Sequence, residues 1–259
     1  QLSLKRMKTD YIDLIQLHNP VTLPDPDDPN GTYAACVEAK KRGYVRFIGI
    51  TSHGRERGRT AVLSGRYDTL QFPLTCIAPQ EDVDLACLAH ERDMGFIAMK
   101  GMAGGLIAHA EAAFVFMKKY PFVVPIWGVQ RESELNQFLE LEKKPPRSED
   151  WAAEIEKERR ELSGNFCHGC GYYQPCAAGI EIQTAARMSL LLRRSPVPPL
   201  MSEKTNAMMM RIEECLHCNA CKSRCPYGLD TPTLLADNLA DYKSFRAGWL
   251  AAQVERAKA

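Results

Sequence analysis

The sequence predicts an α/β fold made of repeated βα units, followed by a mostly α-helical, cysteine-rich domain. Short apolar runs that are typical of buried strands start at residues 11, 45, 69, 96 and 123. Segments with helical patterning lie between these runs. Seven of the ten cysteines then fall into two groups after residue 166. The change from apolar strands to clustered cysteines predicts two domains with different chemistry.

The first half of the chain alternates strand and helix signals. Glycines stand just past two of the helices, at Gly43 and Gly95, where helices commonly end. This regular alternation predicts a parallel sheet, of which five units are visible, whereas a closed (β/α)8 barrel needs eight. The expected strands are Tyr11–His18, Val45–Thr51, Thr69–Pro73, Phe96–Lys100 and Val123–Trp127, and the expected helices cover about 32–42, 55–65, 82–94, 108–120 and 132–142.

The second half opens with a charged helix over Trp151–Leu162. A helical segment over 182–194, a rigid loop at Pro196–Pro199, a segment over 203–214 and a helix over 232–243 are expected to follow. Short helices joined by loops are a suitable frame for clustered cysteines.

The most informative stretch is the run from Cys215 to Pro226. Cys215, Cys218, Cys221 and Cys225 have the spacing C-x2-C-x2-C-x3-C-P, which binds a cubane iron–sulfur cluster in bacterial-type ferredoxins. A structural zinc site more often divides its ligands between two distant C-x2-C pairs, and zinc is the alternative. A disulfide framework fits poorly with a chain whose other features indicate a reducing compartment.

A second cysteine group lies upstream, and Tyr173 stands where its third cysteine would be expected. Together the two groups resemble helical ferredoxin domains that hold two [4Fe–4S] clusters with crossed fourth ligands. This resemblance implies one complete cluster, held by Cys176, Cys215, Cys218 and Cys221. It leaves Cys167, Cys170 and Cys225 for a second site, which could hold a cluster with an open iron, a three-iron cluster, or nothing lasting. A zinc site or idle cysteines is the alternative for the upstream group.

Composition bounds the possible functions. The net charge is +1, so no electrostatic argument favours nucleic acid or a membrane surface as a partner. Hydrophobic residues make up 45% of the chain and charged residues 25%, which is ordinary for a globular protein. No apolar run is long enough to span a bilayer. The remaining cysteines, Cys36, Cys76 and Cys87, have no ligand spacing and are expected to be small buried residues.

Four segments of the first half resemble the aldo/keto reductase family in the right order. The stretch from Asp10 to Pro20 resembles the fourth barrel strand of that family, and Gly43–His53 resembles the fifth. Gly95–Gly105 resembles the seventh strand, and Pro125–Arg131 with Glu134 the eighth and its following helix. The resemblance covers about residues 1–142 and implies the C-terminal five βα units of a TIM barrel. The cysteine domain resembles the C-terminal extension of the iron–sulfur subgroup of these reductases.

The resemblance also assigns residues at the strand ends, where barrel enzymes carry their chemistry. His18 matches the His of the family's Asp–Tyr–Lys–His tetrad, which implies that it orients a substrate carbonyl. Ser52 and Gln71 match positions that hydrogen-bond the nicotinamide amide. Alternatively, His18 is a structural residue, and Ser52 and Gln71 are ordinary polar residues at strand ends.

The loops after the last two strands resemble a cofactor pyrophosphate site. Gly104 and Gly105 would let backbone N–H groups approach a phosphate, although a glycine pair can also be a simple turn. Gly128, Val129 and Arg131 would continue this site at the next helix N-terminus. Relatives that use NADP often have Arg where this chain has Gln130, so the resemblance leaves NAD and NADP both open.

The Asp, Tyr and Lys of the tetrad lie on strands that have no counterpart in this chain, which begins at Gln1 rather than Met. We therefore expect an N-terminally truncated reductase, with a partial barrel over 1–145 and a helical iron–sulfur domain over 146–259. The chain alone is expected to be inactive in carbonyl reduction.

The predicted function is an NAD(P)-linked, cytoplasmic oxidoreductase that interconverts a small carbonyl and its alcohol, with an associated [4Fe–4S] cluster. An electron-transfer partner is possible, and neither nucleic acid nor a membrane is expected. The alternatives are a non-catalytic iron–sulfur electron-transfer or docking module on a barrel scaffold, and a structural metal domain.

Overall fold

The computed structural model describes residues 1–162 and 166–258. Its contacts divide the chain into two compact units. The first contains residues 1–103 and 109–161, and the second contains residues 104–108 and 162–259. The helix α7 (Ser148–Glu161) therefore groups with the first unit, whereas the predicted domain boundary lay at residues 145/146.

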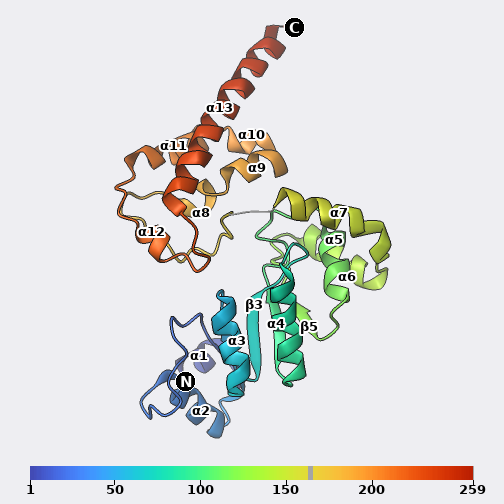
Figure 1. Cartoon of the computed structure of the whole chain (residues 1–259), viewed down its shortest axis with the longest axis vertical. Coiled ribbons are helices and arrows are strands. Elements are labelled where there is room, and N and C mark those ends of the chain that lie inside the picture. Colours follow the sequence, from blue (N-terminus) through green and yellow to red (C-terminus); the bar gives the residue numbers. More distant parts are fainter. Residues whose placement is uncertain (163–165, 259) are drawn as a thin grey trace. The chain divides into compact units, whose positions relative to one another are not determined.

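The first unit is built on a parallel sheet of five strands in the order β1-β2-β3-β4-β5 (Figure 1). Residues of neighbouring strands pair in parallel register, for example Leu17 with Ile50 and Thr51 with Gln71. The strands are β1 (Ile12–Leu17), β2 (Val45–Thr51), β3 (Thr69–Pro73), β4 (Gly95–Met99) and β5 (Val123–Pro125).

Helices connect these strands, because a parallel neighbour can only be reached by a crossover. Figure 1 shows α3 and α4 lying alongside β3. The helices of this unit, besides α7, are α1 (Leu2–Met7), α2 (Thr32–Lys41), α3 (Arg55–Ser64), α4 (Gln80–Glu91), α5 (Ala110–Lys118) and α6 (Glu132–Lys143).

The core of the first unit follows the period-2 alternation of the strands. In β3, Leu70 and Phe72 are buried, whereas Thr69, Gln71 and Pro73 are partly exposed on the opposite face. Further buried apolar side chains come from the neighbouring strands and the covering helices, including Ile48, Ile50, Phe96, Ala98, Ala61, Val62, Leu85, Ala86 and Ala89. The alternation therefore gives β3 a buried face and a face that can present polar groups.

The second unit is helical around a core of its own. Its elements are α8 (Ile182–Ala185), α9 (Met188–Arg194), α10 (Val197–Leu200), α11 (Glu203–Met210), the 3₁₀ helix η1 (Arg211–Glu214), α12 (Ala220–Ser223) and α13 (Thr231–Lys258). Buried apolar residues from most of these elements form one cluster, including Ile180, Ile182, Met188, Met209 and Tyr242.

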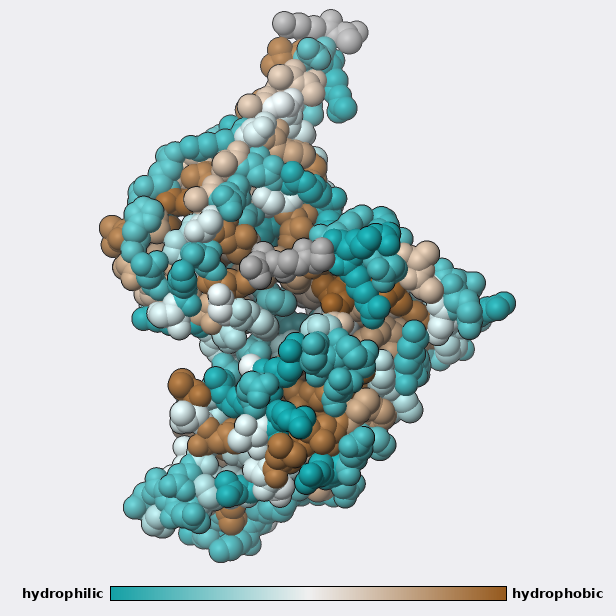
Figure 2. All heavy atoms as spheres, in the orientation of Figure 1, coloured by the Kyte–Doolittle hydropathy of each residue, from teal (hydrophilic) through white to brown (hydrophobic). Residues whose placement is uncertain are grey.

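The helix α13 organises the second unit. The buried Asn238 side chain accepts from Ser189 N at 2.8 Å and donates to Leu234 O at 2.7 Å, so the start of α9 is attached to α13. Arg193 makes a bidentate ion pair with Asp241 at 2.6 and 2.9 Å, and this pair lowers the pKa of the Asp241 carboxyl. On the face seen in Figure 2, the far end of α13 carries both hydrophobic and hydrophilic side chains.

Two sequence expectations for this unit need correction. The helix predicted over 232–243 continues to Lys258, and the segment Pro196–Pro199, expected to be a loop, lies mostly within the short helix α10. Proline can occupy the first turn of a helix because its missing N–H would have no intrahelical partner there. In the part of the chain that the structure describes, no helix combines the length and the apolar character needed to cross a membrane.

Candidate functional site

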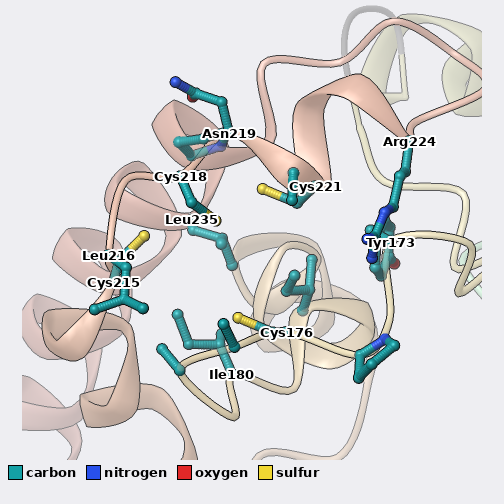
Figure 3. A pocket seen from close by; sticks show the side chains of 16 residues that line it. Tyr173, Cys176, Ile180, Cys215, Leu216, Cys218, Asn219, Cys221, Arg224 and Leu235 are labelled. Carbon is teal, nitrogen blue, oxygen red and sulfur yellow. The ribbon is translucent and has the colours of Figure 1, made fainter.

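Four cysteines of the second unit line one cavity. Cys176 comes from the loop before α8, Cys215 follows η1, Cys218 lies in the next loop, and Cys221 lies in α12. The space among the lining residues, including the part that is open to solvent, has a volume of about 610 Å³. Figure 3 shows the Cys176 and Cys221 sulfurs facing a common space. The structure thus brings together the four thiols that the sequence predicted for one cluster.

Local backbone geometry shapes the loop of the main cysteine run. His217 and Asn219 both have positive φ values, 49° and 58°, so the chain bends sharply on either side of Cys218. Asn219 then caps α12, which carries Cys221. On the opposite wall, the Gln174 side chain accepts from Cys176 N at 3.0 Å and donates to Ile180 O at 3.1 Å. Backbone bends therefore shape one wall, and the hydrogen bonds of Gln174 hold the other.

The environment of these thiols suits a soft metal cluster. The cavity walls are largely apolar, with Ile180, Ile182 and Leu235 among the lining residues. Burial raises the pKa of the Cys221 thiol, and the neighbouring thiols of Cys215 and Cys218 raise it further. Thiolates are the ligands of [4Fe–4S] clusters, and metal binding favours their deprotonation. The donor set fits such a cluster.

A different geometry would be needed for a single ion. Among residues 1–162 and 166–258, no three His, Cys, Asp or Glu side chains form a group that could hold one metal ion. The four thiols instead surround a cavity, as Figure 3 shows.

The upstream group is arranged differently. Cys167 and Tyr173 are each only 2% exposed, and the tyrosine hydroxyl forms a hydrogen bond of 3.0 Å with Cys167 Sγ. Burial, followed by this contact, raises the pKa of the Tyr173 hydroxyl. His168 stacks on Tyr227, with ring centroids 3.9 Å apart, so the Cys167–Cys170 loop lies against the segment that follows Cys225. The three remaining thiols therefore belong to neighbouring segments.

In the first unit, three predicted residues meet at the ends of adjacent strands. His18 follows the last residue of β1 and is exposed, Ser52 follows β2 and is fully buried, and Gln71 lies on the partly exposed face of β3. Strand register places Gln71 opposite Thr51. Asn19 N donates to Thr51 Oγ1 at 2.8 Å, which joins the ends of β1 and β2.

The polar groups of these residues already have partners. The Ser52 hydroxyl donates to Gly54 O at 2.9 Å and accepts from Gly54 N at 3.2 Å. The Gln71 amide donates to Met99 Sδ at 3.7 Å. His18 also has an interaction with a neighbouring group. A ligand at this site would have to compete with these local contacts.

The predicted pyrophosphate residues fall in different units. Gly128, Val129 and Arg131 follow β5 in the first unit, and Gly128 has a φ of 73°. The Glu134 carboxylate accepts from the N–H groups of Gln130 and Arg131 at 2.8 and 3.2 Å, and thereby caps α6.

Gly104 and Gly105 are grouped with the second unit, and their φ values are 69° and 87°. In that unit, Arg187 Nη1 donates to Gly104 O at 2.8 Å, and Arg194 Nη1 donates to Leu106 O at 2.9 Å. The segment containing the two glycines is thus held by arginine side chains, a contact that glycine spacing alone could not predict.

The sequence analysis missed Arg224 as a site residue. Arg224 lines the cavity of the four thiols, as Tyr173 does (Figure 3). Its position directly before Cys225 was a possible signal, since a cation near a thiolate site stabilises negative charge. The hydrogen bond between Tyr173 and Cys167 was also missed.

Comparison with known proteins finds a separate family match for each half of the chain. Residues 1–113 match the family model described as the aldo/keto reductase family, and residues 166–230 match a 4Fe-4S dicluster domain. No curated protein matches the chain.

Solved structures of aldo-keto reductases resemble the chain. An aldose reductase from Giardia lamblia is 14% identical with a TM-score of 0.50, and the match covers 64% of this chain and 67% of that one. An aldo-keto reductase from Bacillus halodurans is 20% identical with a TM-score of 0.49, over 60% of this chain and 61% of that one. The chain thus spans about 61% of the length of this relative.

The predicted fold class is confirmed, since five parallel strands alternate with helices as in a partial barrel and a helical region follows. The chain joins a segment that matches the model of the aldo/keto reductase family to a segment that matches a 4Fe-4S dicluster domain.

Proposed function

We propose that the chain is part of an NAD(P)-linked oxidoreductase that interconverts a small carbonyl compound and its alcohol and carries a [4Fe–4S] cluster. The observation that supports this best is the cavity lined by Cys176, Cys215, Cys218 and Cys221 in the unit that matches a 4Fe-4S domain. The match of residues 1–113 to the aldo/keto reductase family supports the carbonyl chemistry.

In the second unit, the four thiolates would hold the cluster, which supplies one-electron chemistry when it is bound. The apolar walls would limit access of water to the sulfurs, and Arg224 would offset part of the negative charge of the thiolates. Such thiols are kept reduced in the cytoplasm, which is the compartment we propose.

In the first unit, His18 would orient the substrate carbonyl at the end of β1. Ser52 and Gln71 would hydrogen-bond the nicotinamide amide, and Gly128, Val129 and Arg131 would bind the pyrophosphate. The tetrad Asp, Tyr and Lys have no counterpart in residues 1–259. We therefore propose that this chain alone binds the cofactor without reducing a carbonyl.

Cofactor binding tests this proposal directly. Binding of NADPH and of NADH is measured by titration calorimetry for three full-length proteins. These are the parent and the variants Ser52→Ala and Gln71→Met. Each variant removes a hydrogen-bonding group, so we expect affinity for at least one cofactor to fall by about tenfold.

The matched control is Ser64→Ala, which removes a hydroxyl of the same size that donates to Ala61 O within α3. The control should bind like the parent. A parent chain that binds neither cofactor, or site variants that keep the parent affinity, would refute the proposed nicotinamide site.

One observation favours a second candidate, a non-catalytic iron–sulfur electron-transfer or docking module. The Ser52 hydroxyl and the amides of Gln130 and Arg131 are engaged within the chain, whereas the four thiols line an open cavity. A chain that binds a redox-active cluster but no nicotinamide would support this candidate.

A further inference from the structure

Tyr173 lies between the two cysteine sites of the second unit. Its side chain lines the cavity of the four thiols, and its hydroxyl contacts Cys167 of the upstream group. In sequence it occupies the place of the third cysteine of that group. The inference drawn from this position rests on the proposed cluster at the four thiols.

The two sites differ in what lies among their sulfurs. Cys176, Cys215, Cys218 and Cys221 line a cavity that is open to solvent. At the upstream group, the Tyr173 hydroxyl lies 3.0 Å from Cys167 Sγ, and each of the two residues is only 2% exposed. The N–H of Gly169 also donates to this sulfur, at 3.4 Å. Cys167 is therefore a hydrogen-bonded thiol packed in a core.

The surroundings of Cys167 are occupied by protein groups. Cys167 and Tyr173 belong to the same buried cluster as Ile180 and Ile182, and Cys225 packs against it. The ring of His168 stacks on that of Tyr227, with centroids 3.9 Å apart, so the Cys167–Cys170 loop is in contact with the segment after Cys225. A cubane that used Cys167, Cys170 and Cys225 would therefore have to bind a Cys167 sulfur that already contacts the Tyr173 hydroxyl and the N–H of Gly169.

We propose that Tyr173 closes the upstream site, so that the chain holds one cluster where the matching domain type holds two. Replacing a thiol by a phenol removes one soft ligand and leaves Cys167, Cys170 and Cys225 one thiol short of the four that hold a cubane. The same ring serves as a wall of the remaining site. The residues present therefore do not fit a second cluster.

The test restores the missing thiol. The full-length parent, Tyr173→Cys and Tyr173→Phe are reconstituted anaerobically, and iron and acid-labile sulfide per chain are counted, together with reduced-state EPR spectra. We expect about four irons for the parent and for Tyr173→Phe, and about eight for Tyr173→Cys. The EPR spectrum of Tyr173→Cys should show coupling between two clusters.

A second pair of variants leaves Tyr173 in place. Cys225→Ser should retain about four irons, because Cys225 holds no cluster in the parent, whereas Cys221→Ser should lose them. This pair tests the proposal even if Tyr173→Cys does not fold.

The outcomes separate this inference from the proposed function. About seven or eight irons in the parent would overturn the single-cluster inference, and about four in Tyr173→Cys of native helix content would show that Tyr173 does not close the upstream site. Both results would leave the cluster at the four thiols standing. Loss of iron in Cys225→Ser would overturn the inference and also the assignment of the four ligands. A parent that binds no iron and sulfide would overturn both.

Discussion

The cysteines of this chain differ widely in how exposed their side chains are. Cys218 is exposed and lines the cavity of the second unit, whereas Cys76 of the first unit is 0% exposed. Burial raises the pKa of the Cys76 thiol to about 12, with Glu158 adding to the effect and Arg159 opposing it. The environment, and not the residue type, decides which thiols are available for chemistry.

Cys76 should therefore resist alkylation in the folded chain. At pH 8 its thiol is both inaccessible and protonated, so we expect negligible labelling by iodoacetamide under conditions that label the partly exposed Cys87. Peptide mass spectrometry measures both sites. Labelling of Cys76 at the rate seen in guanidinium would contradict its placement.

The same shift makes stability depend on alkaline pH. The pKa of the Cys76 thiol rises from 9.0 to about 12 on folding, so below pH 9 the thiol is protonated in both states and its contribution is fully present. As the pH rises from 9 towards 12, only the unfolded state ionises and this contribution is lost.

For individual residues, the sequence was informative where the spacing of cysteines determines which metal group they can bind. Spacing picked out Cys215, Cys218 and Cys221, and the resemblance to helical ferredoxin domains added Cys176; these four thiols line the cavity. The contact between Tyr173 and Cys167 could not be predicted, because the direction of a phenol hydroxyl depends on packing between segments that are distant in sequence.

Among the elements, β2 and β3 show how close strand packing selects small residues. A Cβ on Gly49 would overlap Thr69 Oγ1 of β3 and would lie 3.2 Å from the Gln16 and Leu14 side chains of β1. The glycine therefore permits β2 to lie between its two neighbours without displacing their side chains.

Gly49→Ala should destabilise the first unit by about 1–3 kcal/mol, because overpacking forces side chains from their preferred rotamers. Urea denaturation should show a lower midpoint with an unchanged slope. Adding Thr69→Ala removes the overlapping atom and should restore part of the loss. A single variant with the stability of the parent would show that the strands are spaced more widely.

Element boundaries were predictable where periodicity was strong. The strands Val45–Thr51 and Thr69–Pro73 were predicted with the observed bounds, because each is a short apolar run of the kind that forms a buried strand. The end of α13 was not predicted: its apolar residues cease to follow a single face, and Leu250 and Val254 are exposed. The periodicity of apolar residues reflects burial, so it cannot mark the end of a helix whose last turns are exposed.

In the whole molecule, each of the two units carries its own candidate site. The first unit presents His18, Ser52 and Gln71 at the ends of adjacent strands, and the second lines a cavity with four thiols. The sequence predicted this division because strand rhythm and cysteine spacing occur in different halves of the chain. It placed Gly104 and Gly105 with the strand ends, whereas the contacts of Arg187 and Arg194 group them with the second unit.

The central claim is that Cys176, Cys215, Cys218 and Cys221 hold a redox-active [4Fe–4S] cluster. Metal and sulfide analysis of the anaerobically purified chain, combined with the visible spectrum before and after dithionite, tests it most directly. We predict about four irons and four sulfides, reversible bleaching, and loss of all three in Cys218→Ala. A chain that binds zinc without sulfide and shows no bleaching would not hold an iron–sulfur cluster at these cysteines.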